Sequence, residues 1–350
     1  MEIQLPARHR AGSYRTVASR IPVRSPGGRP TASQIAACHD AIVSNDIPER
    51  RGRIRVLVGP GVVDAGMVEE LRVFAAAGGL GVANTWGAKG VFAWDSPHHL
   101  GTCGLQARDF ELLGFADADL IVTIGLDDAE SPPGRVRLAP LLELEPDDLV
   151  AAAGRVRAEG DPIRNDLYPR LAAVAQPGFV DDSVPLHPAR AVADLGAALP
   201  PDGFLSAEPG VAGLWVARTF PTPALSPGAP RRVVVPAHRE PGIGVRLAVE
   251  QARAGRPSIA VATAPLDPAS IAALDQIRDE RLPLVATVWD DQAPGTGRVE
   301  TYRARIDAAL AAGRPGVVEV PVNLDATGQL LAAAGEVVAW GGLTSAESRG

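Results

Sequence analysis

The sequence predicts an α/β protein with two tandem domains, each built on a parallel sheet. Short apolar runs alternate with amphipathic, alanine-rich segments along most of the chain, and glycine turns separate them. A length of 350 residues is sufficient for two globular domains. The aromatic content of 4% requires cores made of small aliphatic side chains, which suits buried strands covered by helices.

The N-terminal residues predict an arm followed by a helix. Residues 1–30 carry arginine, glycine and proline without helical or strand periodicity, and they end in the linker-like run SPGGRP. Residues 31–43 have apolar residues at helical spacing, with Thr31 or Ser33 as the N-cap. The arm is therefore expected to be loosely docked.

The first domain is predicted over residues 31–165, where strands and helices alternate as a parallel sheet requires. Apolar runs predict strands at residues 53–59, 81–85, 119–128 and 141–148. Periodic segments predict helices at residues 67–79 and 104–118.

Residues 166–200 are predicted to be a linker with one helix at 188–198, because proline and polar turns are frequent there. The second domain is predicted over residues 201–330. It begins with the runs 203–210, 213–220 and 231–236, and continues with helices at 242–255, 267–280 and 298–313 and strands at 258–265, 282–291 and 316–322. The tail, residues 331–350, is expected to fray.

Composition excludes several classes of protein. A net charge of −7 gives no basic surface for nucleic acid. Cys38 and Cys103 are isolated and predict neither a disulfide framework nor a zinc site, which fits a reducing cytoplasm. No apolar run is long enough to cross a bilayer, so we expect no membrane partner and a cytoplasmic location.

Residues 55–130 carry VLVGPGV, TWGAKGVFAWDSPHHLGTCG and DLIVTIGLDDAE in that order. This stretch resembles the central domain of thiamine diphosphate-dependent enzymes such as acetolactate synthase and the decarboxylases. The second half, with LSAEPGVAGLWVARTF and PGIGVRLAVEQARAG, resembles their diphosphate-binding domain more faintly. The resemblance implies two Rossmann-like or flavodoxin-like domains, and it implies a homo-oligomer because family members place the cofactor between subunits.

The resemblance also supplies candidate nucleotide-binding residues in the first domain. Gly59 and Gly61 follow a strand and could let the backbone approach a pyrophosphate at a helix N-terminus. A tight strand-to-helix turn would need the same glycines, so a purely structural role is the alternative. In cofactor-binding relatives the ligand is FAD or ADP, and the loops that contact it correspond here to Thr85, Trp86, Gly87, Gly125, Asp127 and Asp128. Many other relatives keep this domain empty, so a purely structural role is the alternative for these residues.

The second domain departs from the family pattern at its metal motif. The family holds Mg²⁺ with a G-D-G turn and a later N-N pair, which together anchor thiamine diphosphate. Here residues 264–266 read Ala-Pro-Leu, and Asp290 and Asp291 stand in the place of N-N. Asp267 could replace the lost aspartate, so the candidate magnesium ligands are Asp267, Asp290 and Asp291. The alternative for Asp267 is a helix N-cap directly before Pro268.

Other reactive side chains predict no site of their own. His98 and His99 could serve in metal binding or acid–base chemistry, but no acidic or cysteine partner has ligand spacing nearby, which favours a structural role. Lys89 is the only lysine in the chain, and its place in a KG turn suggests no nucleophile.

A catalytic triad is not assigned either. Ser206, Glu208 and His238 do not assemble into one from sequence alone, and no catalytic residue is predicted.

The departures from the family pattern predict a degenerate member that cannot alone catalyse carbanion or decarboxylation chemistry and that serves as a binding or regulatory protein. Residues before Arg53 resemble only the exit linker of the pyrimidine domain, which in the family supplies the glutamate that activates the cofactor. One alternative is a diphosphate-binding subunit of a split 2-oxo acid decarboxylase or carboligase, completed by a separate pyrimidine-domain subunit. Another is a structural partner of a full-length homologue.

Overall fold

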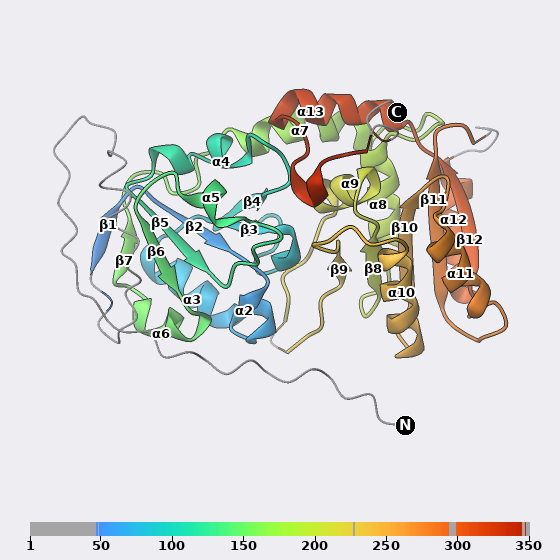
Figure 1. Cartoon of the computed structure of the whole chain (residues 1–350), viewed down its shortest axis with the longest axis horizontal. Helices are drawn as coiled ribbons and strands as arrows, with labels where there is room; N and C mark the ends of the chain where they lie inside the picture. Colours follow the sequence, from blue (N-terminus) through green and yellow to red (C-terminus); the bar gives the residue numbers. More distant parts are fainter. Residues whose placement is uncertain (1–46, 48, 227, 294–298, 345–346, 348–350) are drawn as a thin grey trace.

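The computed structural model describes residues 47, 49–226, 228–293, 299–344 and 347. The arm predicted over residues 1–30 and the helix predicted over 31–43 lie outside the described residues. Two parallel sheets lie side by side, the first domain in blue and green and the second in yellow to red (Figure 1). The predicted pair of α/β domains is therefore confirmed.

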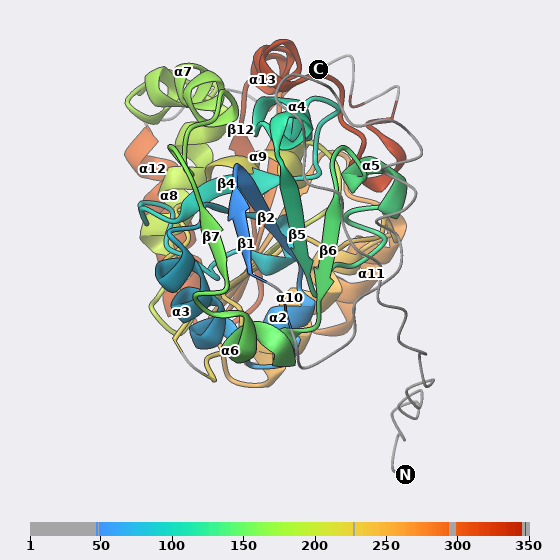
Figure 2. The ribbon, with the colours of Figure 1, turned by 90° about the vertical axis from the view of Figure 1, so that its left-hand side faces the viewer.

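The first domain contains a five-stranded parallel sheet in the order β4-β3-β2-β5-β6. Numbered along the chain, this is the 3-2-1-4-5 order of Rossmann-type sheets. Its strands are β2 (Ile54–Val58), β3 (Val82–Thr85), β4 (His99–Cys103), β5 (Leu120–Ile124) and β6 (Leu141–Leu144). Its helices are α2 (Gly61–Asp64), α3 (Val68–Gly78), α4 (Asp109–Leu112), α5 (Pro133–Val136) and α6 (Leu149–Ala152). A short parallel pair, β1 (Arg50–Gly52) with β7 (Val156–Ala158), faces the viewer in Figure 2.

Several elements of this domain differ from the prediction, among them one helix and one strand with a clear physical reason. The helix predicted over residues 104–118 is broken into α4 and a 3₁₀ turn, Phe115–Asp117, because Gly114 adopts a left-handed conformation with φ 73°. The sequence does not predict strand β4, because its residues, HLGTC, form no apolar run. Its last residue, Cys103, is a buried free cysteine.

The second domain contains a five-stranded parallel sheet in the order β12-β11-β10-β8-β9, which is the flavodoxin-like order 2-1-3-4-5 along the chain. Its strands are β8 (Phe204–Ala207), β9 (Val233–Val234), β10 (Ser258–Thr263), β11 (Leu284–Asp290) and β12 (Gly316–Pro321). Its helices include α9 (Val211–Thr219), α10 (Ile243–Arg253), α11 (Pro268–Gln276) and α12 (Val299–Ala311). These confirm the predicted helices and strands.

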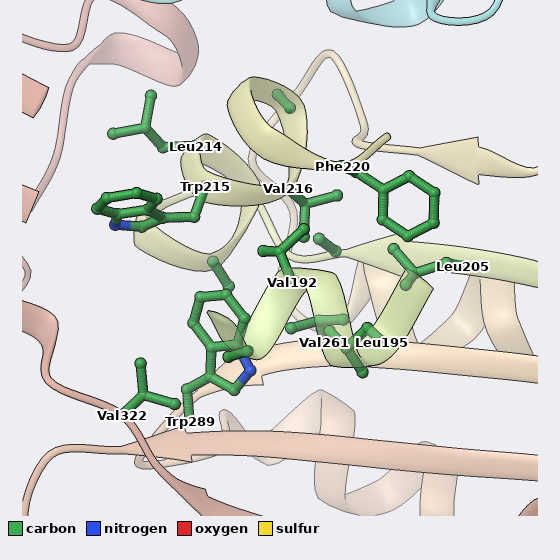
Figure 3. Close-up of a cluster of buried hydrophobic side chains, with 14 of the residues drawn as sticks. Val192, Leu195, Leu205, Leu214, Trp215, Val216, Phe220, Val261, Trp289 and Val322 are labelled. Carbon is green, nitrogen blue, oxygen red and sulfur yellow. The ribbon is translucent and has the colours of Figure 1, made fainter. Parts of the chain in front are cut away.

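The larger core of the second domain lies between its sheet and the helices α8 (Pro188–Ala198) and α9 (Figure 3). Trp215 of α9 and Trp289 of β11 are among the largest fully buried side chains. The indole nitrogen of Trp215 donates a hydrogen bond to Thr327 Oγ1 at 3.0 Å, so burial of the ring leaves no unpaired donor. Small side chains fill the remaining space, as the composition predicts.

The segment predicted as a linker, residues 166–200, contains two helices, α7 (Leu167–Phe179) and α8 (Pro188–Ala198). The bounds of α8 match the predicted helix. Helix α8 contributes Val192 and Leu195 to the core of the second domain, so this part of the segment is packed like the domain that follows it.

The expectation of a frayed tail is wrong for the described residues 331–344. Helix α13 (Thr327–Ala334) lies alongside α7 at the top of Figure 1. The side-chain amide of Gln106 donates to the carbonyl oxygens of Leu330 (2.9 Å) and Gly335 (2.7 Å), and Val337 and Ala339 are buried. Contacts with the first domain therefore hold the tail in place.

Among the residues that the structure describes, no helix combines the length and apolar character needed to cross a bilayer.

Candidate functional site

Each sheet has one switch point, a place where neighbouring strands are connected in opposite directions. It lies between β2 and β5 in the first domain and between β8 and β10 in the second. Ligands of open α/β sheets bind outside the carboxyl ends of the strands at such points. We define these places as the first and the second switch point.

At the first switch point, main chain packs directly on main chain. The N–H groups of Gly59 and Gly61 donate to the carbonyl oxygens of Ile124 and Gly125, each at 2.9 Å. A Cβ atom on Gly59 would lie 2.3 Å from the Gly125 oxygen. These two glycines therefore serve the contact between the turns that follow β2 and β5, and their N–H groups already have acceptors within the protein.

The loop after β3 is held by a buried acid that the sequence did not single out. The N–H of Gly87 donates to Glu130 Oε2 at 3.0 Å, and a Cβ atom on Gly87 would lie 2.3 Å from Oε1. Thr85 and Trp86, the other predicted residues of this loop, are buried in the protein interior. Burial raises the pKa of Glu130 to about 7, although the Gly87 N–H opposes this shift.

This raised pKa predicts a pH-dependent stability. An unfolded glutamate titrates near ~4.3, so between that pH and about 7 the folded protein binds the Glu130 proton more tightly than the unfolded chain. Rising pH should therefore destabilise the fold across this window, by about 3 kcal/mol from this group alone. In Glu130→Gln, urea unfolding at pH 5 and pH 8 should lack this contribution, whereas Glu143→Gln on an exposed face is the matched control. An unchanged pH dependence in Glu130→Gln would contradict the assignment.

The two aspartates that follow β5 differ in their surroundings. Asp127 accepts a hydrogen bond from the Ala129 N–H at 2.9 Å, and its carbonyl oxygen accepts from Glu130 and Ser131. Asp127 therefore forms the turn that places Glu130, whereas Asp128 is exposed. Their assignment to a nucleotide stays a prediction.

At the second switch point, the carboxylate of Glu208 lies at the N-terminus of α10. Glu208 follows β8, and its Oε1 accepts a hydrogen bond from the Val245 N–H at 3.1 Å. Burial raises the pKa of Glu208 above its ordinary value, although hydrogen bonds from Val245 and Gly244 lower it in part. A protein carboxylate thus takes the N–H groups that helix N-termini offer to anions.

Asp267 acts in the same way at the next helix. Its carboxylate accepts from the N–H groups of Ala269 (2.9 Å) and Ser270 (3.1 Å) and from the Ser270 hydroxyl (2.6 Å). Burial is the largest effect on the Asp267 carboxyl and raises its pKa, but these hydrogen bonds and one from Gly242 together lower it below the ordinary value. The predicted alternative, an N-cap of α11, is confirmed.

The other two candidate metal ligands are farther along the sheet edge. Asp290 ends β11, and its Oδ1 accepts from the Gln292 N–H at 2.9 Å; Asp291 is exposed. Within the described residues, no three acidic, histidine or cysteine side chains form a group that could hold a metal ion. The assignment of Asp267, Asp290 and Asp291 to magnesium stays a prediction.

A thiamine diphosphate with its metal does not fit the second switch point as the structure has it. The N–H groups of Val245, Ala269 and Ser270 already donate to protein carboxylates. A diphosphate placed there would meet the carboxylates of Glu208 and Asp267, and these like charges repel unless a firmly held metal ion lies between them. No reaction step through this cofactor follows from the geometry.

The remaining candidates have structural partners. His98 Nδ1 lies 2.9 Å from the Leu80 carbonyl oxygen. The Ser206 hydroxyl donates to the Gly244 carbonyl oxygen at 2.5 Å, while His238 is exposed, so no triad forms around this serine. His99, by contrast, lies on β4 at a cavity between the domains.

Sequence reasoning missed Glu130 and undervalued Glu208. Glu208 carried a signal, since an acid directly after a predicted strand points to a switch point. Glu130 carried none, because its role depends on a loop 43 residues earlier in the chain.

Comparison with known proteins gives a match to the first domain. Residues 49–148 match the family model described as thiamine pyrophosphate enzyme, central domain. A solved structure from Mycobacterium smegmatis, provisionally described as a thiamin diphosphate-dependent enzyme, is similar at 20% sequence identity with a TM-score of 0.57. The match covers 77% of this chain and 61% of that one, so the chain spans less than two thirds of that protein's length. Comparison with curated proteins gives no match.

Proposed function

We propose that this chain, a thiamine pyrophosphate enzyme family protein by its central domain at residues 49–148, is a degenerate member with a binding or regulatory role. Alone it would not catalyse carbanion or decarboxylation chemistry. We further propose that it forms a homo-oligomer or associates with a homologue of the family.

One observation carries this proposal: the carboxylates of Glu208 and Asp267 take the main-chain donors at the second switch point. Residues 264–266, Ala-Pro-Leu, add no metal ligand beside them. Holding a diphosphate there would require both carboxylates to leave their hydrogen bonds. Each charge-assisted bond of this kind is worth about 1.5–3 kcal/mol, so the rearrangement is costly.

Calorimetry tests the proposal directly. Titrating the full chain with thiamine diphosphate and Mg²⁺ should give no binding heat, whereas an intact acetolactate synthase treated in the same way should bind. Glu208→Gln is the matched variant, because it removes a negative charge at the second switch point and keeps an acceptor oxygen for Val245. If the unaltered chain binds the cofactor with micromolar affinity, the proposal is wrong.

The alternative is a diphosphate-binding subunit of a split enzyme that a separate pyrimidine-domain subunit completes. The observation that favours it is the intact pair of parallel sheets, each with its strand ends aligned at a switch point. Binding heat that appears only when such a subunit is added would support this alternative and remove the degenerate one.

A further inference from the structure

A cavity of about 500 Å³ lies between the two domains, away from both switch points. Its wall is mainly apolar and includes Leu171 and Phe179 of α7 and Phe220 after α9. Lys89 and His99 of the first domain also line it. A largely apolar cavity of this size with a few polar groups is typical of a small-molecule site.

The cavity holds the only ε-amine of the protein. Lys89 Nζ donates a hydrogen bond to the Ala217 carbonyl oxygen at 2.9 Å, which fixes the amine at the cavity wall. No aspartate or glutamate is among the described residues that line the cavity. Burial, and secondarily the charge of Arg218, lower the pKa of Lys89 to about 7, so a large fraction of the amine is unprotonated near neutral pH.

Arg218, the other cation at the cavity, already has hydrogen-bond and ion-pair partners within the protein. Arg218 pairs with Asp109 at 2.5 Å and donates to Gln106 Oε1 and to the Thr102 carbonyl oxygen. It therefore offers little to an anionic ligand.

His99 is a second titratable group at the cavity. Its Nδ1 is buried and has no hydrogen-bond partner among the described residues. Burial, then the charge of Lys89, lower the pKa of His99 to about 4, so its imidazole is neutral at pH 7. Tyr168 of α7 is the remaining titratable group at the cavity.

We propose that this cavity binds an apolar aldehyde or ketone and that Lys89 condenses with its carbonyl group. The nitrogen lone pair adds to the carbonyl carbon, and a proton passes from nitrogen to oxygen to give a carbinolamine. Loss of water then forms the imine, with no oxidant or reductant required. Desolvated lysines in apolar pockets are the usual nucleophiles of this chemistry. This role of Lys89 is not suggested by its place in a KG turn, and it is independent of the proposed function.

Reductive trapping tests the inference, because the chain has one lysine. The full-length protein is incubated with hexanal and sodium cyanoborohydride at pH 7, and the product is measured by intact mass and peptide mapping. We expect one hexyl group on Lys89. The rate should exceed that of the urea-unfolded chain by about 10²–10³-fold, since an ordinary lysine with a pKa near ~10.4 is almost fully protonated at pH 7.

Two variants and one internal control test whether the labelling depends on Lys89 and on the cavity. Lys89→Arg should retain a cation but lose the label. Ala172→Phe should fill part of the cavity and slow labelling of an intact Lys89. The N-terminal amine is mapped separately as an internal reference for the activity of the reagent. Labelling of the N-terminal amine alone, equal Lys89 rates in both states, or hexanal binding without covalent trapping would each overturn the inference.

Discussion

Replacing Asp109 by alanine is expected to lower the free energy of unfolding by about 3–5 kcal/mol, because a buried ion pair would lose one partner. The side chains of Arg218 and Asp109 are 1% and 0% exposed. Asp109→Ala would leave the guanidinium buried without its counter-charge. Urea denaturation followed by circular dichroism measures the loss.

The same change should also loosen the contact between domains. Arg218 belongs to α9 of the second domain, whereas Asp109, Gln106 and Thr102 belong to the first. Asp109 further accepts from the Gln106 N–H at 3.0 Å, so it organises the loop that receives the arginine. We expect the two domains of Asp109→Ala to unfold in separate transitions, visible as a second step in the denaturation curve.

Glu111→Ala is the matched control. Glu111 lies on the same short helix, and its ion pair with Arg108 is largely exposed. Exposed pairs contribute little, so this variant should keep the denaturation midpoint of the unaltered protein. The double variant Asp109→Leu/Arg218→Met should recover part of the lost stability, since apolar side chains of similar volume often replace a buried pair without penalty. Equal free energies of unfolding for Asp109→Ala and Glu111→Ala would show that the buried ion pair stabilises the protein no more than the exposed one.

Features that depend on neighbouring residues could be predicted from the sequence. Helix α8 begins at the predicted Pro188, and the cap of α11 follows from Asp267 before Pro268. The apolar runs of β2 and β5 predicted a parallel sheet because strands buried on both faces need no alternation.

Features that depend on distant residues could not be predicted from the sequence. Arg218 and Asp109 are 109 residues apart, and neither belongs to a sequence pattern that predicts a buried ion pair. Docking of the tail depends on Gln106, a single polar residue whose amide reaches Leu330 across 224 residues. The same holds for the candidate site. The sequence predicted the positions of the glycine turns, but it did not predict that the carboxyl group of Glu130 contacts one of them.

The glycines of the first switch point lead to the second large prediction. Gly59→Ala is expected to destabilise the protein by about 3 kcal/mol or more, because a small-to-large change in tightly packed main chain cannot be relieved by a rotamer. The new Cβ would lie 2.3 Å from the Gly125 oxygen and 2.5 Å from Leu126 Cα. Both contacts are with backbone, so the turns after β2 and β5 would have to separate.

Gly328→Ala is the control that distinguishes the close backbone contact at Gly59 from the general effect of replacing a glycine by alanine. Gly328 lies in α13, and a Cβ there would have no atom within 4 Å. This substitution should stabilise the helix by up to about 1 kcal/mol. Both variants are compared by thermal and urea unfolding with no nucleotide present. A large loss in Gly59→Ala under these conditions would assign the glycine to packing, because a glycine kept for a bound pyrophosphate would tolerate a methyl group when no ligand is there.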